Sequence, residues 1–171
     1  MGTLTVDNLN LKGSGSVSSV GRILQIVQTT KTDTFSTTST SFTDVTGFSA
    51  TITPSSTSSK VLVMVSSNSS TSGGNNAIMK FVRGSTDIFV GDDDGASREE
   101  ATAQTRVNDT NAALTLTFNF LDSPSTTSAT TYKLQYKVQA GTGTINMTQA
   151  DSNSATLART ASSIILVEVR G

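Results

Sequence analysis

The chain contains no histidine, no cysteine and no tryptophan. Without histidine it lacks the usual general base near neutral pH and the commonest transition-metal ligand. Without cysteine it has neither a thiolate nucleophile nor the ligands of a structural zinc site. No Gly-x-Ser-x-Gly elbow and no phosphate-cradling glycine motif occurs. We therefore expect that the protein is not an enzyme, and we predict no catalytic residue and no cofactor.

Concentrated positive charge and long apolar runs are also absent. The net charge is −1, and the twelve lysine and arginine residues are scattered along the chain. Binding to a phosphate backbone needs a basic face, so we expect no nucleic-acid partner. No apolar stretch approaches the roughly 20 residues that a membrane span requires, and no secretory signal is visible, so we expect no membrane partner. The lack of cysteine favours assembly in a reducing cytoplasm.

Serine and threonine are abundant and make up about a third of the residues. Threonine favours strands and serine favours turns, so this bias indicates an all-β protein. Residues 114–121 show the clearest period-two alternation, and residues 132–138 repeat it. Residues 60–65 are almost continuously apolar, which predicts a strand buried on both faces. The expected core is Ile23, Ile26, Val61, Val63, Val65, Leu114, Leu116, Phe118, Phe120, Leu134, Tyr136, Ile164, Leu166 and Val167.

The chain divides into two parts. Residues 1–20 contain two short alternating runs and then Gly13-Ser14-Gly15-Ser16, which is typical of a flexible hinge. This part is too short to form a core, so we predict an extended N-terminal anchoring arm over residues 1–20. Residues 21–171 are predicted to form one antiparallel two-sheet sandwich of about eight or more strands.

Three sequence segments in the second half of the chain suggest a family. They are Leu121-Asp122-Ser123-Pro124, then Thr131-Tyr132-Lys133-Leu134-Gln135-Tyr136, and finally the apolar run Ser162-Ser163-Ile164-Ile165-Leu166-Val167-Glu168-Val169. The layout from residue 21 to 169 resembles the C1q/TNF-like jelly-roll surface proteins of tailed bacteriophages, particularly the fibre and decoration proteins of marine and cyanobacterial phages. The resemblance implies a jelly roll, a homotrimer and a place on the virion surface after synthesis in the cytoplasm of the bacterial host.

Two locations on the virion follow from this resemblance. A tail fibre normally needs an adaptor domain and a shaft, and we expect neither here. We therefore expect a structural protein that decorates or cements the capsid, or a short head fibre. Residues 1–20 would attach it to the major capsid protein or another virion protein. The alternative is a tail-fibre tip or receptor-binding module that contacts host surface glycans, and a glycan-cleaving enzyme is a remote third option.

One acidic cluster resembles a metal site. Asp92, Asp93 and Asp94 lie between two glycines, and crowded carboxylates of this kind can hold Ca²⁺. Their spacing does not match the EF-hand loop, and Arg98 and Arg106 could neutralise them instead. We therefore favour a solvated loop and expect Asp92, Asp93 and Asp94 to hold no calcium.

Overall fold

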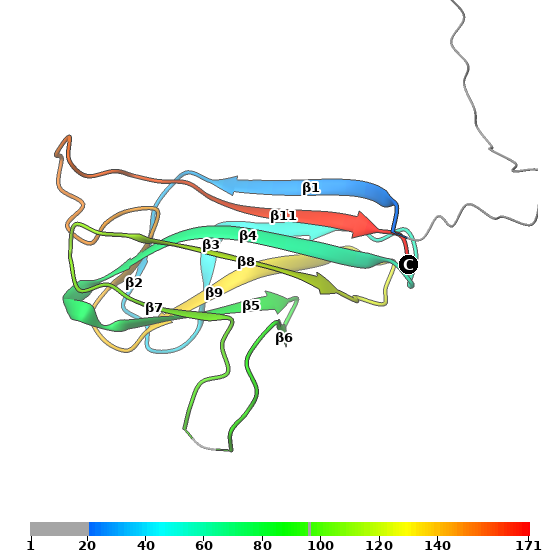
Figure 1. Cartoon of the computed structure of the whole chain (residues 1–171), viewed down its shortest axis with the longest axis horizontal. Coiled ribbons are helices and arrows are strands. Elements are labelled where there is room, and N and C mark those ends of the chain that lie inside the picture. The colour runs from blue at the N-terminus through cyan, green and yellow to red at the C-terminus, as the bar shows by residue number, and fades with distance from the viewer. Residues whose placement is uncertain (1–20, 96) are drawn as a thin grey trace, which may run out of the picture.

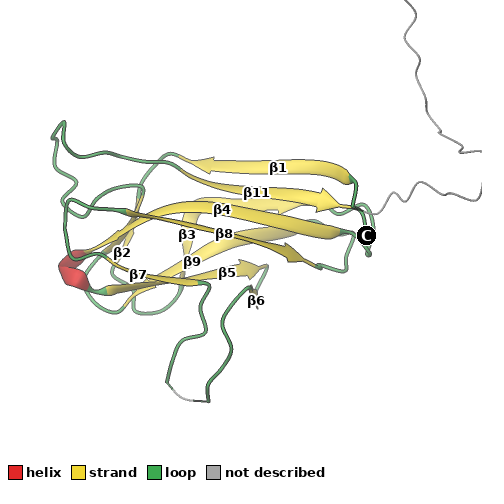
Figure 2. Ribbon diagram, viewed as in Figure 1, coloured by secondary structure: helices red, strands yellow, loops and turns green. Residues whose placement is uncertain are grey.

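A computed structural model describes residues 21–95 and 97–171 of the protein (Figures 1 and 2). These residues form eleven β-strands and one short 3₁₀ helix, Ser72–Gly74. The strands are β1 (Ile23–Lys31), β2 (Phe35–Thr37), β3 (Thr43–Ile52), β4 (Lys60–Thr71), β5 (Asn76–Arg83), β6 (Thr86–Ile88), β7 (Ala103–Arg106), β8 (Leu114–Asp122), β9 (Thr130–Val138), β10 (Gly143–Ile145) and β11 (Ser162–Val169).

The strands build two antiparallel sheets. One has the order β1-β11-β4-β10-β2, with β8 also paired to β4. The other has the order β3-β9-β5-β6, with β7 also paired to β5. Five antiparallel pairs are nested along the chain: β1 with β11, β2 with β10, β3 with β9, β4 with β8, and β5 with β7. This nesting defines a jelly roll and places the C-terminal strand inside a sheet, so the predicted fold class is confirmed.

The core lies between the two sheets and is made by alternate residues of the long strands. Most of the expected core is confirmed, but three of its members are wrong, and Val167, although buried, lies on the outer face of its sheet and outside the core cluster. Ile23, Ile26 and Leu114 are 58%, 63% and 45% exposed. A register irregularity between Ile23 and Gln25 shifts the inward and outward alternation of β1 by one residue. Gln25 and Val27 therefore face inward. Leu114 occupies the first position of β8, at the margin of the core.

The aromatic residues of β8 are less buried than the sequence predicts. Leu116, Phe118 and Phe120 face the core but are only half-buried, because β8 pairs with β4 alone. Phe89, which follows β6 at a φ of +53°, stacks on Phe120 with ring centroids 4.6 Å apart. Phe89 therefore covers the half-buried ring of Phe120 on its solvent side.

The expectation that residues 60–65 are buried on both faces is wrong. Val61, Val63 and Val65 are buried, whereas Leu62 is half-buried and Met64 is 37% exposed. In a two-sheet sandwich each sheet has one inner face, so the alternate residues of β4 point outward. The apolar character of both sides of β4 therefore leaves apolar side chains on the outside of the molecule.

The described chain begins and ends at the same end of the sandwich. The amide of Gly21 donates to the carbonyl oxygen of Arg170 over 2.8 Å. The segment from residue 146 to 161, the β4–β5 turn and the β7–β8 loop lie at the opposite end (Figure 1). The predicted arm, residues 1–20, lies outside the described residues and stays a prediction.

Candidate functional site

The acidic loop lies between β6 and β7. Asp92, Asp93 and Asp94 are all exposed. The Asp93 carboxylate accepts a hydrogen bond from the amide of Gly95 over 2.8 Å, and Asp94 forms an ion pair with Arg98 at 3.3 Å. Arg106, the other expected neutralising residue, lies in β7 opposite Asn76. Across residues 21–95 and 97–171, no three acidic, histidine or cysteine side chains converge as metal ligands would.

Calcium should therefore have little effect on this protein. We expect that chelation with EDTA leaves the melting temperature unchanged, because a ligand stabilises a protein only if it binds the folded state. Asp93→Asn should change the free energy of unfolding by less than about 0.5 kcal/mol, as surface substitutions usually do. Thermal melts with EDTA and with added calcium check both expectations. A calcium-dependent rise in melting temperature that Asp93→Asn abolishes would contradict this interpretation.

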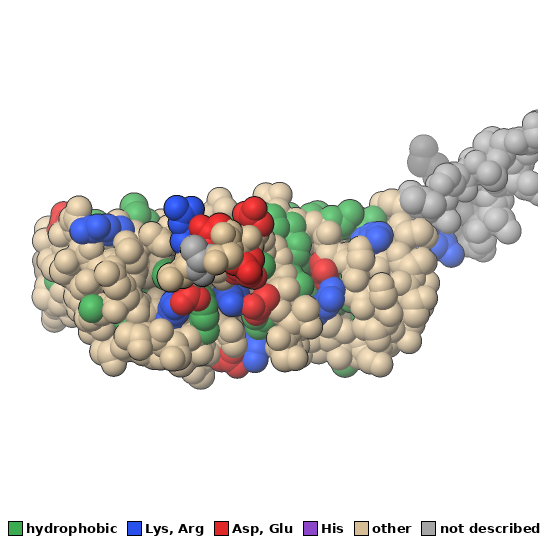
Figure 3. Space-filling view, turned by 90° about the horizontal axis from the view of Figure 1, so that it is seen from below, with side chains coloured by type: hydrophobic (Ala, Val, Ile, Leu, Met, Phe, Trp, Pro, Cys, Tyr) green, Lys and Arg blue, Asp and Glu red, His purple; other side chains and the backbone are tan. Residues whose placement is uncertain are grey.

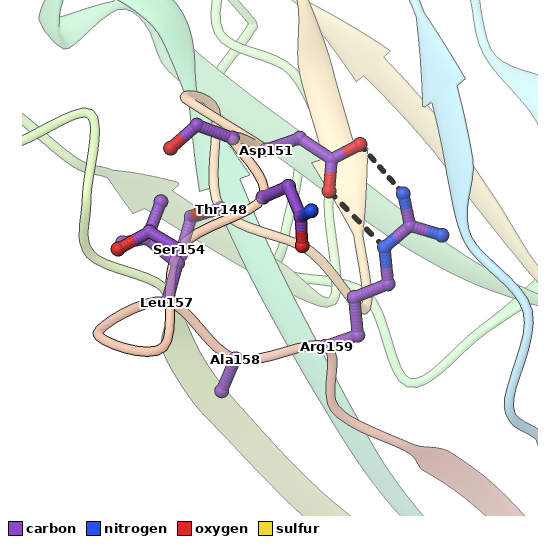
Figure 4. A pocket seen from close by; sticks show the side chains of 8 residues that line it. Thr148, Asp151, Ser154, Leu157, Ala158 and Arg159 are labelled. Atoms are coloured by element: carbon purple, nitrogen blue, oxygen red, sulfur yellow. Dashed lines mark hydrogen bonds and ion pairs between the residues drawn. The ribbon is translucent and has the colours of Figure 1, made fainter.

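A small polar cavity lies in the segment before β11, at the end of the sandwich far from the chain ends. It has a volume of about 280 Å³ and is lined by serine, threonine and asparagine side chains together with Leu157. The guanidinium of Arg159 donates two hydrogen bonds to the carboxylate of Asp151, over 2.8 and 3.1 Å (Figure 4). The cavity offers polar groups to a ligand, but its one carboxylate is already paired with Arg159, so it lacks the two-carboxylate arrangement of glycoside hydrolysis.

The outer face of the β3-β9-β5 sheet carries charge. Lys133 pairs with Asp44 at 2.6 Å, Lys80 pairs with Asp87 at 2.8 Å, and Lys137 pairs with Glu99. Figure 3 views the molecule from below and shows acidic and basic side chains gathered around the middle of this side. Exposed ion pairs of this kind contribute little to stability but keep a surface hydrated.

The outer face of the other sheet is uncharged over three successive rows of residues, of which the first is apolar, the second is half apolar and the third consists of serine and threonine. Strand partners share a face, so the register of β1, β11, β4 and β8 places the members of each row side by side. The rows are Ile26-Val167-Leu62-Leu121, Gln28-Ile165-Met64-Asn119 and Thr30-Ser163-Ser66-Thr117. We call the six apolar residues of the first two rows the apolar sheet face.

Four of the six large hydrophobic residues that are exposed in the described part of the chain lie on or next to the apolar sheet face. Ile26, Met64 and Leu121 belong to it, and Ile23 flanks it opposite Val169. A shallow depression of about 220 Å³ opens between Met64, Ile165 and Asn119. The aromatic side chains of β8, Phe118 and Phe120, face the other way, into the core. This contiguous apolar surface is the strongest candidate site on the molecule.

Glu168 is an acidic residue buried inside the sandwich. Its side chain is fully buried and accepts hydrogen bonds from the amide and hydroxyl of Ser55, both over 2.7 Å, and from the Gln25 amide over 2.6 Å. Burial by itself would raise the pKa of Glu168, but these hydrogen bonds outweigh it and lower the pKa to about 2. The carboxylate fastens the loop before β4 to β11, which is a structural role.

A partly buried polar cluster joins the two sheets near the chain ends. The Arg83 guanidinium donates to both carboxylate oxygens of Asp122, over 2.6 and 2.7 Å, and the Tyr132 hydroxyl donates to the same carboxylate over 2.6 Å. Burial, and then the hydrogen bond to Asp122, raises the pKa of the Tyr132 hydroxyl far above its ordinary value. This cluster links β5, β8 and β9, which is a structural role.

Sequence reasoning found the acidic loop but missed the apolar sheet face and Glu168. The signal for the face was present, because residues 60–65 are apolar at nearly every position. The signal for Glu168 was its place in an apolar run, two residues from Leu166 on the inward side of β11.

Known proteins give little help with function. No family model and no curated protein matches the chain. The fold is similar to that in T=1 particles derived from infectious bursal virus, at 16% identity over 98% of this chain and 44% of that chain, with a TM-score of 0.46. The Gx strain of infectious bursal disease virus gives 16% identity over 96% and 42%, with a TM-score of 0.44. The chain spans less than half the length of these proteins, and similarity at this level bears on neither function nor partners.

No helix in the described residues is both long and apolar enough to cross a membrane.

Proposed function

We propose that the protein is a structural component of a tailed-phage virion, displayed on the particle surface as a homotrimeric jelly roll. The observation that carries this proposal is the unequal pair of outer faces. One face bears the ion pairs Lys133–Asp44, Lys80–Asp87 and Lys137–Glu99, and the other bears no charge across its three central rows. A jelly roll of this kind has a hydrated side for solvent and an apolar side for assembly.

The positions of the chain ends support attachment through the N-terminus. Gly21, the first described residue, lies beside Arg170 at one end of the sandwich. An arm that leaves from this end can bind the major capsid protein or another virion protein while the far loops stay exposed. We favour a capsid decoration protein or short head fibre, synthesised in the cytoplasm of the bacterial host.

A tail-fibre tip that contacts host glycans is the second candidate. It is favoured by the polar cavity beside Arg159, which lies at the end of the sandwich opposite the chain ends. Hydroxyl and amide side chains around a small cavity can hydrogen-bond a sugar. A catalytic role for the same cavity has no support, because Asp151 is paired with Arg159.

Electron microscopy of phage particles labelled with an antibody to this chain tests the proposal. We expect gold label on the capsid surface of intact particles. Deleting residues 1–20 should leave a folded jelly roll, because the strands of the described core all lie beyond residue 20, and should abolish label on the particles. Circular dichroism of the purified truncated chain is the control for folding.

The outcomes separate the two candidates. Label at the tip of the tail would favour the receptor-binding module, and label on no part of the particle would contradict a virion protein. A truncated chain that still loads onto particles would place the attachment surface within residues 21–171.

A further inference from the structure

β8 is a long edge strand whose outer edge, the side that faces away from β4, has no strand partner. Among the described residues β8 pairs with β4 alone, so the backbone N–H and C=O groups of its outer edge meet no neighbouring strand. The pairing runs without irregularity from Leu114 to Asp122, and no charged residue or proline precedes Asp122 in the strand. Natural proteins usually keep edge strands short, bulged, charged or covered, because a long regular edge pairs with other strands. The outer edge of β8 is therefore suited to strand addition.

The other edges of the two sheets are protected within the part of the chain that the structure describes. β2, β6 and β7 are only three or four residues long. β1 and β3 each contain a register irregularity. Side chains also tie these two strands together, since the Lys31 ammonium donates to the carbonyl oxygen of Thr46 over 2.8 Å and the Gln25 amide donates to that of Thr53 over 2.7 Å. The outer edge of β8 has no comparable protection.

The core is also incompletely covered along the outer edge of β8. Leu116, Phe118 and Phe120 face inward but are only half-buried, and Phe89, which stacks on Phe120, is 48% exposed. A strand added beside β8 would direct alternate side chains toward this margin of the core. A segment with apolar residues at alternate positions would therefore satisfy the backbone of β8 and cover its inward side chains together.

We infer that residues 3–11 of the same chain add to the outer edge of β8 as a parallel strand. They read Thr3-Leu4-Thr5-Val6-Asp7-Asn8-Leu9-Asn10-Leu11, which is nine residues, the same length as β8. Apolar and polar residues alternate within each of its two runs, as in a strand with one covered face. The inference goes beyond the proposed function, because it gives residues 3–11 a binding site on the domain itself, whichever virion protein the arm meets.

The position of Gly21 allows this pairing within one molecule. The pairing of β1, β11, β4 and β8 places Asp122, the last residue of β8, at the same end of the sandwich as Gly21. The vacant position beyond β8 lies four strand spacings from β1, which is about 19 Å. Residues 12–20 can span about 30 Å when extended, so they are long enough to carry residues 3–11 to this position. Residue 11 would then lie nearest Asp122 and residue 3 nearest Leu114, which makes the two strands parallel.

A second copy of β8 is the competing occupant. Two β8 strands could pair edge to edge, and this arrangement would not need residues 1–20. The two occupants therefore differ in whether the outer edge of β8 stays covered when residues 1–20 are removed.

Hydrogen exchange of the β8 amides, measured by NMR on the purified full-length chain, tests the inference. We expect these amides to be protected along the whole strand. In a chain that lacks residues 1–20, alternate amides of β8, those that point away from β4, should exchange at least tenfold faster, while the amides of β11 keep their rates. This alternation distinguishes the loss of an added strand from a general loss of stability, which would speed exchange throughout the domain.

Proline substitutions in the arm give a second test that leaves its length unchanged. The double variant Thr5→Pro/Val6→Pro removes two neighbouring backbone donors from the added strand, so it should cause the same alternating loss of protection. Ser18→Pro/Ser19→Pro is the matched control, because it lies outside residues 3–11, and it should leave the exchange rates of β8 unchanged. Equal exchange in the two proline variants, or in the full-length and truncated chains, would overturn the inference.

Two further comparisons separate this inference from its neighbours. Protection that returns when the labelled truncated chain is mixed with unlabelled full-length chain would show that the arm of another copy occupies the edge, and would overturn pairing within one chain. All of these measurements use purified protein. Their failure would leave the proposed virion role intact, whereas a lack of antibody label on particles would contradict that role and leave the added strand intact.

Discussion

Replacing Asn146 by alanine should lower the free energy of unfolding by about 3 kcal/mol or more, because it leaves several buried groups without partners. Asn146 is fully buried at a φ of +64°, just after β10. Its side-chain amide donates to the carbonyl oxygens of Lys31 and Asp33 over 2.8 and 3.1 Å. Its side-chain oxygen accepts from the hydroxyl of Ser162 over 2.6 Å. One side chain therefore fastens the end of β1, the turn between β1 and β2, and the start of β11.

Two companion variants separate the contributions at this position. Asn146→Gly loses the same hydrogen bonds but tolerates a positive φ, so it should be about 1 kcal/mol less damaging than alanine. Asn111→Ala, at an exposed position, should change stability by less than about 0.5 kcal/mol. Urea denaturation measures all three variants. A loss below about 1 kcal/mol for Asn146→Ala, a size typical of surface positions, would show that the network does not hold these strands.

Replacing Glu168 by glutamine should have the second largest effect and should change the response to acid. At neutral pH we expect a loss of about 3 kcal/mol, since hydrogen bonds to a charged group contribute about 1.5–3 kcal/mol each. The amide of glutamine also turns a donor toward Ser55 and Gln25, which are donors themselves. Glu100→Gln, in the loop before β7, is the matched control and should have little effect.

The pH dependence follows from the direction of the shift. The pKa of Glu168 is about 2 in the folded protein and has an ordinary value of 4.5, so the folded state binds fewer protons between these values. The stabilisation by ionised Glu168 is complete above about pH 4.5 and is lost as the pH falls toward 2. The stability difference between the natural protein and Glu168→Gln should therefore shrink over this range. A difference that stays constant from pH 7 to pH 3 would contradict a low pKa for Glu168.

Sequence reasoning predicted best the strands whose own residues alternate between apolar and polar or form a continuous apolar run. Alternation in residues 114–121 and 132–138 predicts β8 and β9, and the last apolar run predicts β11. β7 was missed because Ala103–Arg106 lies within the longest polar stretch and contributes to a sheet chiefly through its backbone pairing with β5. Pairing of that kind leaves no trace in the alternation of side chains.

The direction in which a strand faces was harder to predict than its existence. Ile26 points outward because β1 changes phase near Gln25, and nothing in the local composition indicates this change. Asn146 lies in a polar segment, where a buried asparagine has the same sequence context as an exposed one. The apolar run at residues 60–65 was detected, but the sequence could not show that only one side of this strand is covered by the described part of the chain.

Association of three copies of this chain is the claim on which the proposed surface role depends. Sedimentation equilibrium of the purified full-length chain, near neutral pH and without added metal, tests it most directly. The expected result is a single species with three times the 17.7 kDa mass of one chain, stable at micromolar concentration. A species with the mass of one chain under the same conditions would contradict the account.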